Sequence, residues 1–272
     1  RGASQASPVQ YYVPMDNIAI TIDAEGIAQL ALNRPDSLNA LSLDLMQETC
    51  DTLAGLAADE QVTALVITGR GRAFCAGADL ARGFPPKEGE SPGEMVAGAM
   101  ERLFNPMMQQ IYEFPRPVIT AVNGLAAGGG VGIALCADVV LLSEAASFRV
   151  VQAPKLGIVA DLGANWLLPR LGGRSRAMAM CLLGENIPAG TLLDWGLALE
   201  SVTPDELEGR ALDYARRLAA LPRETVMATR RLVDGACGLS FAQMLEEERR
   251  AQRQLCDQPV FMESVSRFLD KS

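Results

Sequence analysis

Three consecutive glycines, Gly128, Gly129 and Gly130, constrain this chain more than any other feature. They follow an apolar strand predicted over residues 117–122, and they open an apolar segment through residue 136 that predicts a buried helix. Glycine lets a backbone approach a ligand closely because no Cβ intervenes. The first turn of a helix also leaves N–H groups without an intrahelical partner. The run therefore predicts either tight helix–sheet packing or a ligand site lined by backbone amides.

A second segment with small residues lies at 74–80, with the sequence Phe-Cys-Ala-Gly-Ala-Asp-Leu. It follows an apolar strand predicted over residues 62–68. Two strand ends with free amides can direct two N–H donors at one carbonyl oxygen, which is the geometry of an oxyanion hole. The pairing of the two segments favours a ligand site over simple packing.

These segments resemble two signatures of the crotonase superfamily, the enoyl-CoA hydratase/isomerase family. Residues 121–130 resemble A-x-N-G-x-A-x-G-G-G, and residues 74–80 resemble F-x-A-G-A-D-[LI]. Residues 32–41, 168–172 and 261–269 are similar to further landmarks, so the resemblance covers nearly the whole chain. It implies an α/β fold: a crotonase-like spiral of β-β-α turns, followed by a helical C-terminal region that packs trimers, often paired into hexamers.

We expect three regions: an extension over residues 1–14 without stable structure, a spiral core with the CoA and acyl site over 15–200, and a C-terminal helical oligomerisation region over 201–272. Strands alternate with helices in the first half, which predicts mostly parallel pairing. Strands are predicted over residues 17–23, 27–32, 62–68, 117–122 and 138–143. Helices are predicted over residues 42–58, 93–112, 162–171, 175–183, 204–221, 224–236 and 241–256.

Composition excludes several classes of function. The formal net charge of −9 argues against nucleic acid and anionic membrane surfaces as partners. No apolar run could span a bilayer and no secretory signal is seen, so we expect a cytoplasmic protein. The six cysteines form no C-x-x-C pair, and we expect their thiols to be reduced. The chain has no histidine, which excludes Ser-His-Asp and Cys-His catalysis and histidine-ligated zinc. Any proton transfer must use Asp, Glu, Tyr, Lys, Cys or water.

The resemblance implies that the amides of Ala76 and Gly129 stabilise the enolate of a thioester substrate. Hydratases of this family carry two glutamates at positions that are Gly132 and Ala153 here, and neither residue can transfer a proton. By the same resemblance, Asp161 aligns with an acidic residue found in several relatives, which include isomerases and a CoA-dependent dehalogenase. Its apolar neighbours are expected to raise its pKa and make it a better base. The alternative role for Asp161 is an N-cap of the helix that follows.

The resemblance also implies a binding site for CoA, which enters as part of the thioester substrate, and neither a tightly bound cofactor nor a metal. The candidate CoA-binding residues are Arg34, Leu38, Ala40, Ala78, Asp79 and Leu80. Further basic residues near the loops are solvated charges or part of a phosphate cluster, namely Arg70, Arg72, Arg82 and Lys87. Trp166 belongs either to the core or to the wall of an acyl pocket.

One carboxylate suffices for an isomerase, because the same group removes a proton from one carbon and returns it two carbons away. We therefore expect an enoyl-CoA isomerase in which Asp161 carries the proton. The alternatives are an enoyl-CoA hydratase or another crotonase-type lyase or hydrolase, and a CoA-ester-binding protein with little catalysis.

Overall fold

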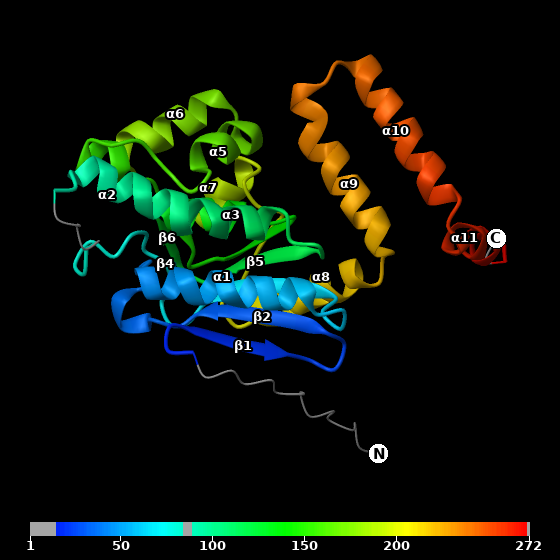
Figure 1. The fold of residues 1–272 in the computed structure, drawn as a ribbon, viewed down its shortest axis with the longest axis horizontal. Helices are drawn as coiled ribbons and strands as arrows, with labels where there is room; N and C mark the ends of the chain where they lie inside the picture. The colour runs from blue at the N-terminus through cyan, green and yellow to red at the C-terminus, as the bar shows by residue number, and fades with distance from the viewer. Residues whose placement is uncertain (1–14, 84–88, 271–272) are drawn as a thin grey trace. The chain divides into compact units, whose positions relative to one another are not determined.

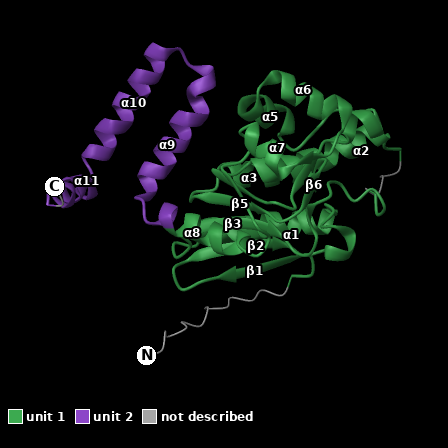
Figure 2. Cartoon of the chain, turned by 180° about the vertical axis from the view of Figure 1, so that it is seen from behind, with its two compact units in different colours: residues 1–216 green, residues 217–272 purple. Residues whose placement is uncertain are grey.

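The computed structural model describes residues 15–83 and 89–270 (Figure 1). The chain divides into two compact units, one up to Arg216 and one from Arg217 onward (Figure 2). This boundary lies later than the predicted 200/201, because helix α8 (Leu207–Ala219) packs on the first unit. Ala211 and Ala215 of α8 are fully buried. The predicted extension over residues 1–14 and Lys87 lie outside the described residues.

The larger sheet has six strands in the order β1-β2-β3-β5-β7-β10. Its strands are β1 (Ile18–Ile22), β2 (Ile27–Leu32), β3 (Ala64–Gly69), β5 (Val118–Val122), β7 (Val139–Ser143) and β10 (Glu200–Val202). β1 and β2 form the predicted antiparallel hairpin, and all other neighbours pair in parallel. Every residue of β5 is buried, as expected for a central strand covered on both faces. The predicted parallel architecture is confirmed.

A smaller sheet was not predicted. Its strands are β4 (Ala73–Cys75), β6 (Leu125–Ala127), β8 (Ser147–Arg149) and β9 (Ile187–Pro188), in that spatial order. β4, β6 and β8 are parallel neighbours, and β9 pairs with β8 in the antiparallel sense. The chain thus adds one strand to each sheet in turn, β3 then β4, β5 then β6, β7 then β8. Helices separate these pairs, which gives the expected spiral of β-β-α turns.

Helix α1 (Leu43–Ala58) begins after Ser42, whose Oγ accepts a hydrogen bond from the amide of Leu45 at 3.2 Å, as predicted for an N-cap. The helical stretch predicted over 93–112 consists of α2 (Pro92–Ala99), a π-helical turn (Met100–Phe104) and α3 (Asn105–Tyr112). The remaining helices of the first unit are α4 (Gly129–Leu135), α5 (Ala164–Gly172), α6 (Arg174–Leu183) and α7 (Ala189–Asp194). The second unit contains α9 (Arg223–Gly235), α10 (Phe241–Cys256) and α11 (Pro259–Leu269). Among the residues that the structure describes, no helix is both long and apolar enough to cross a membrane.

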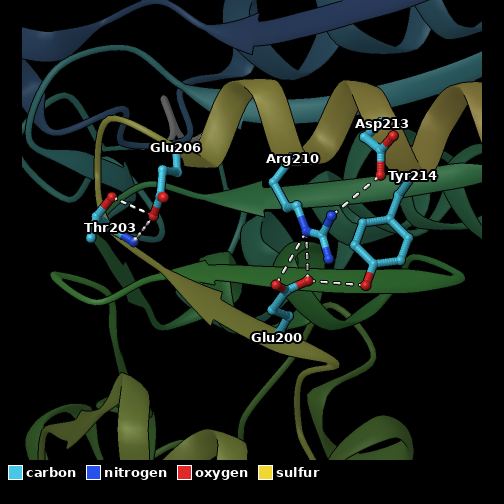
Figure 3. Close-up of polar contacts among 6 residues, drawn as sticks. All are labelled: Glu200, Thr203, Glu206, Arg210, Asp213 and Tyr214. Atoms are coloured by element: carbon cyan, nitrogen blue, oxygen red, sulfur yellow. Dashed lines mark hydrogen bonds and ion pairs between the residues drawn. The ribbon is translucent and has the colours of Figure 1, made fainter.

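Figure 3 shows the polar network that ties α8 to β10. The Nε of Arg210 donates to both carboxylate oxygens of Glu200, at 3.1 and 3.0 Å, and the hydroxyl of Tyr214 donates to Glu200 at 3.0 Å. Nearby, the hydroxyl of Thr203 donates to Glu206 at 2.6 Å. These partly exposed groups satisfy one another, so the cluster explains how α8 docks on the first unit.

Candidate active site

The candidate site lies at one edge of the smaller sheet, where three parallel neighbouring strands end. β4 pairs with β6, and β6 pairs with β8, all in the parallel sense. Their carboxyl ends therefore share an edge, and they lead into residues 76–78, 128–129 and 150–152. The sequence predicted that the two loops leave the strands at 62–68 and 117–122. The structure corrects this, because β4 and β6 stand between those strands and the loops.

The glycines bring the first two loops into backbone contact. Gly77 has a φ of +86°, and a Cβ added there would lie 2.8 Å from the carbonyl oxygen of Ala127 and 3.4 Å from the amide nitrogen of Gly129. Gly128 has a φ of +53°, which L side chains rarely adopt. Side chains at these positions would separate the loops, so glycine is what allows the Gly129 amide to lie beside Gly77.

The two backbone amides proposed from sequence, those of Ala76 and Gly129, differ in whether they already donate to a protein acceptor. The amide of Ala76 donates to the carbonyl oxygen of Leu38 at 3.0 Å, so it is occupied and cannot serve as a free donor. Within residues 15–83 and 89–270, the amides of Ala78 and Gly129 donate to no protein acceptor. The structure thus argues against Ala76 as a free donor and leaves unpaired amides at Ala78 and at Gly129, the latter at the start of α4.

Asp161 lies against the start of α4. Its Oδ1 is 3.5 Å from the position that a Cβ on Gly129 would occupy, and it accepts a hydrogen bond from Nε2 of Gln152 at 2.9 Å. The N-cap of α5 is Gly163, and no side-chain cap hydrogen bond is formed there, so Asp161 does not cap that helix. Burial raises the pKa of Asp161 above its ordinary value, and the hydrogen bond from Gln152 opposes part of this effect.

The turn that carries Asp161 also occupies the space beside Gly132. A Cβ added to Gly132 would lie 2.0 Å from the carbonyl oxygen of Leu162, which has a left-handed φ of 46°. A Cβ on Gly130 would lie 2.3 Å from the carbonyl oxygen of Cys75. Helix α4 therefore needs glycine on two sides, and the backbone of Leu162 fills the place where a glutamate side chain at position 132 would begin.

The proposed CoA-binding residues are largely engaged with one another. An Nη2 of Arg34 lies 2.8 Å from Oδ2 of Asp79, and both side chains are buried. Arg34 also donates to the carbonyl oxygen of Ala40. Leu38 contributes its carbonyl oxygen to the 75–79 loop as described above, and the amide of Asp79 donates to Leu41. Leu80, in contrast, is 63% exposed.

The other residues considered from sequence differ in their exposure. Arg70, Arg72 and Arg82 are exposed. Trp166 is 39% exposed, makes an edge-to-face contact with Tyr112 at 5.7 Å between ring centroids, and has the guanidinium of Arg170 over its ring. It is therefore neither a fully buried core residue nor a free surface residue.

Burial raises the pKa of the Cys75 thiol to about 12, although a hydrogen bond at Gly77 opposes this shift. Cys75 is thus a neutral, buried thiol that packs behind the loop.

Sequence reasoning missed Gln152, which donates to Asp161. The available signal was weak: Gln152 is the one polar residue in the apolar run 150–153. Gln152 is 4% exposed, so its side chain is held inside the site and not in solvent.

Comparison with known proteins relates most of the chain to one family. A family model described as enoyl-CoA hydratase/isomerase matches residues 23–272. The chain is 35% identical over 247 residues to a 1,2-epoxyphenylacetyl-CoA isomerase of Escherichia coli strain K12, covering 91% of this chain and 93% of that protein. It is 36% identical over 249 residues to a probable enoyl-CoA hydratase of Rhodobacter capsulatus, with the same coverage of 91% and 93%. The crystal structure of an enoyl-CoA hydratase from Bacillus anthracis superimposes with a TM-score of 0.86 at 28% identity, covering 94% of this chain and 97% of that one.

Proposed function

The chain belongs to the enoyl-CoA hydratase/isomerase family, and on that premise we propose that it is an enoyl-CoA isomerase working with one carboxylate. In this proposal Asp161 removes a proton from the α-carbon of a 3-enoyl thioester and returns it to the γ-carbon, which leaves a 2-enoyl thioester. One proton is removed and one is added, so the mass of the substrate is unchanged and no water is consumed.

The observation that carries this proposal is the position of the Asp161 carboxylate, whose Oδ1 lies 3.5 Å from the Cβ position of Gly129. A base at this point is adjacent to a free amide donor. The two positions that hold glutamates in hydratases are Gly132 and Ala153, so no second carboxylate is present there to activate water. A raised pKa suits Asp161 to the role, because a carboxylate with a higher pKa is a stronger base for removing a proton from carbon.

In the same proposal the amides of Ala78 and Gly129 bind the thioester oxygen. Removing the α-proton places negative charge on that oxygen, and two preorganised donors stabilise this charge. Loss of one such donor typically costs about 2.7–4 kcal/mol of transition-state stabilisation. The CoA moiety would pass along the turn after β2, which contains Leu38 and Ala40, and the loop after β4, which contains Leu80. The buried pair of Arg34 and Asp79 joins these two segments.

The proposal is tested by incubating the wild-type protein, Asp161→Asn and a control variant with a panel of 2-enoyl- and 3-enoyl-CoAs in D₂O, followed by mass spectrometry. The panel includes 1,2-epoxyphenylacetyl-CoA, because the E. coli relative is named for that substrate. Asp44→Asn is the control, since Asp44 is an exposed aspartate of α1. We expect a shifted double bond with deuterium incorporation in the wild type and the control, and loss of turnover with retained CoA-ester binding in Asp161→Asn.

Three results would contradict the proposal. Undiminished turnover in Asp161→Asn would show that Asp161 does not carry the proton. A mass gain of one water would support a hydratase, as the name of the R. capsulatus relative suggests. Binding of CoA esters without any conversion across the panel would support a binding protein.

A further inference from the structure

We infer that Gln152 is a positioning residue that orients the carboxylate of Asp161 for proton transfer, an assignment that rests on the proposed function. Nε2 of Gln152 donates to Oδ1 of Asp161 at 2.9 Å. Within the described part of the chain, this is the side chain that donates a hydrogen bond to that carboxylate.

The fold brings Gln152 to this point from a third strand. It begins the π-helical turn Gln152–Leu156, which follows β8 at the same sheet edge as the two glycine loops. A Cβ added to Gly128 would lie 3.6 Å from Nε2 of Gln152, so the amide packs on the glycine run. Gln152, Gly129 and Asp161 therefore meet around the first turn of α4.

The backbone of the turn that carries Asp161 is anchored, since Ala160 is 6% exposed and its carbonyl oxygen accepts a hydrogen bond from Nδ2 of Asn165 at 2.6 Å. These contacts place the backbone, but they do not fix the rotation of the carboxylate about its side-chain bonds. A hydrogen bond from a buried partner limits rotation of the carboxylate. It engages Oδ1, and the backbone amide of Asp161 itself contributes a further hydrogen bond to the carboxylate.

The other end of the Gln152 amide shows that the residue is not there for packing alone. Its Oε1 is buried and has no hydrogen-bond partner among the described residues. A buried acceptor without a partner is unfavourable for stability, and a methionine of similar length would avoid that cost. Reversing the amide would place Oε1 against the carboxylate, where two acceptors repel. The donor facing Asp161 is therefore the chemically useful feature of this side chain.

The test compares Gln152→Met with the wild type. We expect kcat to fall about tenfold to a hundredfold, as misplacement of a catalytic group does, with little change in KM. The hydrogen bond lowers the pKa of Asp161, so its loss raises that pKa and moves the acidic limb of kcat/KM to higher pH. The melting temperature is expected not to fall, which separates the effect from unfolding.

Gln110→Met is the matched control. Gln110 lies on α3 and likewise has a buried Oε1 without a partner among residues 15–83 and 89–270, but the side chain that donates to Asp161 there is that of Gln152. It is expected to keep the wild-type kcat and pH profile. Unchanged kcat and pH profile in Gln152→Met would overturn the inference, as would equal losses in both variants.

A readout independent of activity separates this inference from the proposed function. The ¹³C-carboxyl signal of Asp161, identified by its absence in Asp161→Asn, is titrated by NMR in the wild type and in Gln152→Met. A higher pKa in Gln152→Met supports the hydrogen bond even if no isomerisation is found. Equal pKa values overturn the positioning role even if isomerisation is found.

Discussion

At the scale of single residues, the site is shaped by side chains that are missing. Gly77, Gly130 and Gly132 each have backbone or loop atoms within 3.0 Å of the point where a Cβ would lie. Such distances are shorter than van der Waals contact, so any larger residue must move its neighbour. At Gly132 the neighbour is the carbonyl oxygen of Leu162, which follows directly after Asp161.

Gly132→Ala is therefore expected to displace the turn that carries Asp161. Overpacking of this kind costs about 1–3 kcal/mol of unfolding free energy, and turnover should fall at the same time. Gly55→Ala is the control, because Gly55 is an exposed residue of α1 with no atom within 4 Å of its Cβ position. That variant should gain about 0.5–1 kcal/mol from helix propensity. Urea denaturation measures both, and equal stability of Gly132→Ala and the wild type would contradict the packing argument.

Ionisation of the Asp161 carboxylate also affects the stability of the folded protein. Because burial raises its folded-state pKa, the ionised form is disfavoured in the folded protein, and stability is lost as the pH rises through that pKa. Asp161→Asn removes the buried charge. We expect this variant to melt at a higher temperature than the wild type at pH 7, with the difference vanishing near pH 4, about the ordinary pKa of aspartate. A lower melting temperature at pH 7 would show that the charge is stabilising.

At the scale of elements, one buried ion pair joins the turn after β2 to the loop after β4. Arg34 and Asp79 belong to these two segments, and their side chains are each 8% exposed. Burial alone would raise the pKa of Asp79, but hydrogen bonds from Arg34 and from the amide of Arg82 outweigh it and hold the pKa below its ordinary value. The pair thus fixes the loop that carries the free amide of Ala78.

Arg34→Met should cost about 3–5 kcal/mol of unfolding free energy, because it leaves a buried carboxylate without its partner. The double variant Arg34→Met/Asp79→Asn should recover part of this loss. Since the pKa of Asp79 is lowered on folding, the contribution of the pair is present above the ordinary aspartate pKa of about 3.9 and is lost as the pH falls through the lower folded-state value. Chemical denaturation at pH 7 and at acidic pH checks both parts, and additive losses in the double variant would contradict the coupling.

At the scale of the whole molecule, the C-terminal unit leaves apolar side chains on its surface. Val233 of α9, Phe241 at the start of α10 and Leu269 at the end of α11 are 67%, 79% and 64% exposed. Helices with a wide apolar stripe are stable when that stripe is covered. We expect a homotrimer or a dimer of trimers in which these side chains are covered.

Light scattering coupled to size exclusion should therefore give a mass of three or six copies of the 29.0 kDa chain. A dilution series extends the measurement to low concentration. If these helices are buried against another copy, the assembly should persist there. A single-copy mass at all concentrations would contradict this prediction, and the exposed side chains would then need another explanation.

The sequence by itself determined the elements whose pattern is local. The hairpin of β1 and β2, the buried strands β3, β5 and β7, and α1 with its Ser42 cap follow from hydrophobic periodicity and capping chemistry, which report on neighbours a few residues apart. The glycine run and the absence of glutamates at positions 132 and 153 were also visible in the sequence alone.

Only the tertiary structure decided the details of the site. Strands β4, β6 and β8 have three residues each, too few to show an alternating pattern, and they form because neighbouring strands pair with them. Whether the amide of Ala76 or Ala78 is free depends on the carbonyl oxygen of Leu38, 38 residues away from the first of them. The contact between Gln152 and Asp161 likewise requires the π-helical turn after β8 to fold back onto the start of α4. These partners lie nine residues apart in one case and 38 in the other, and they meet through tertiary packing, which no local pattern in the chain encodes.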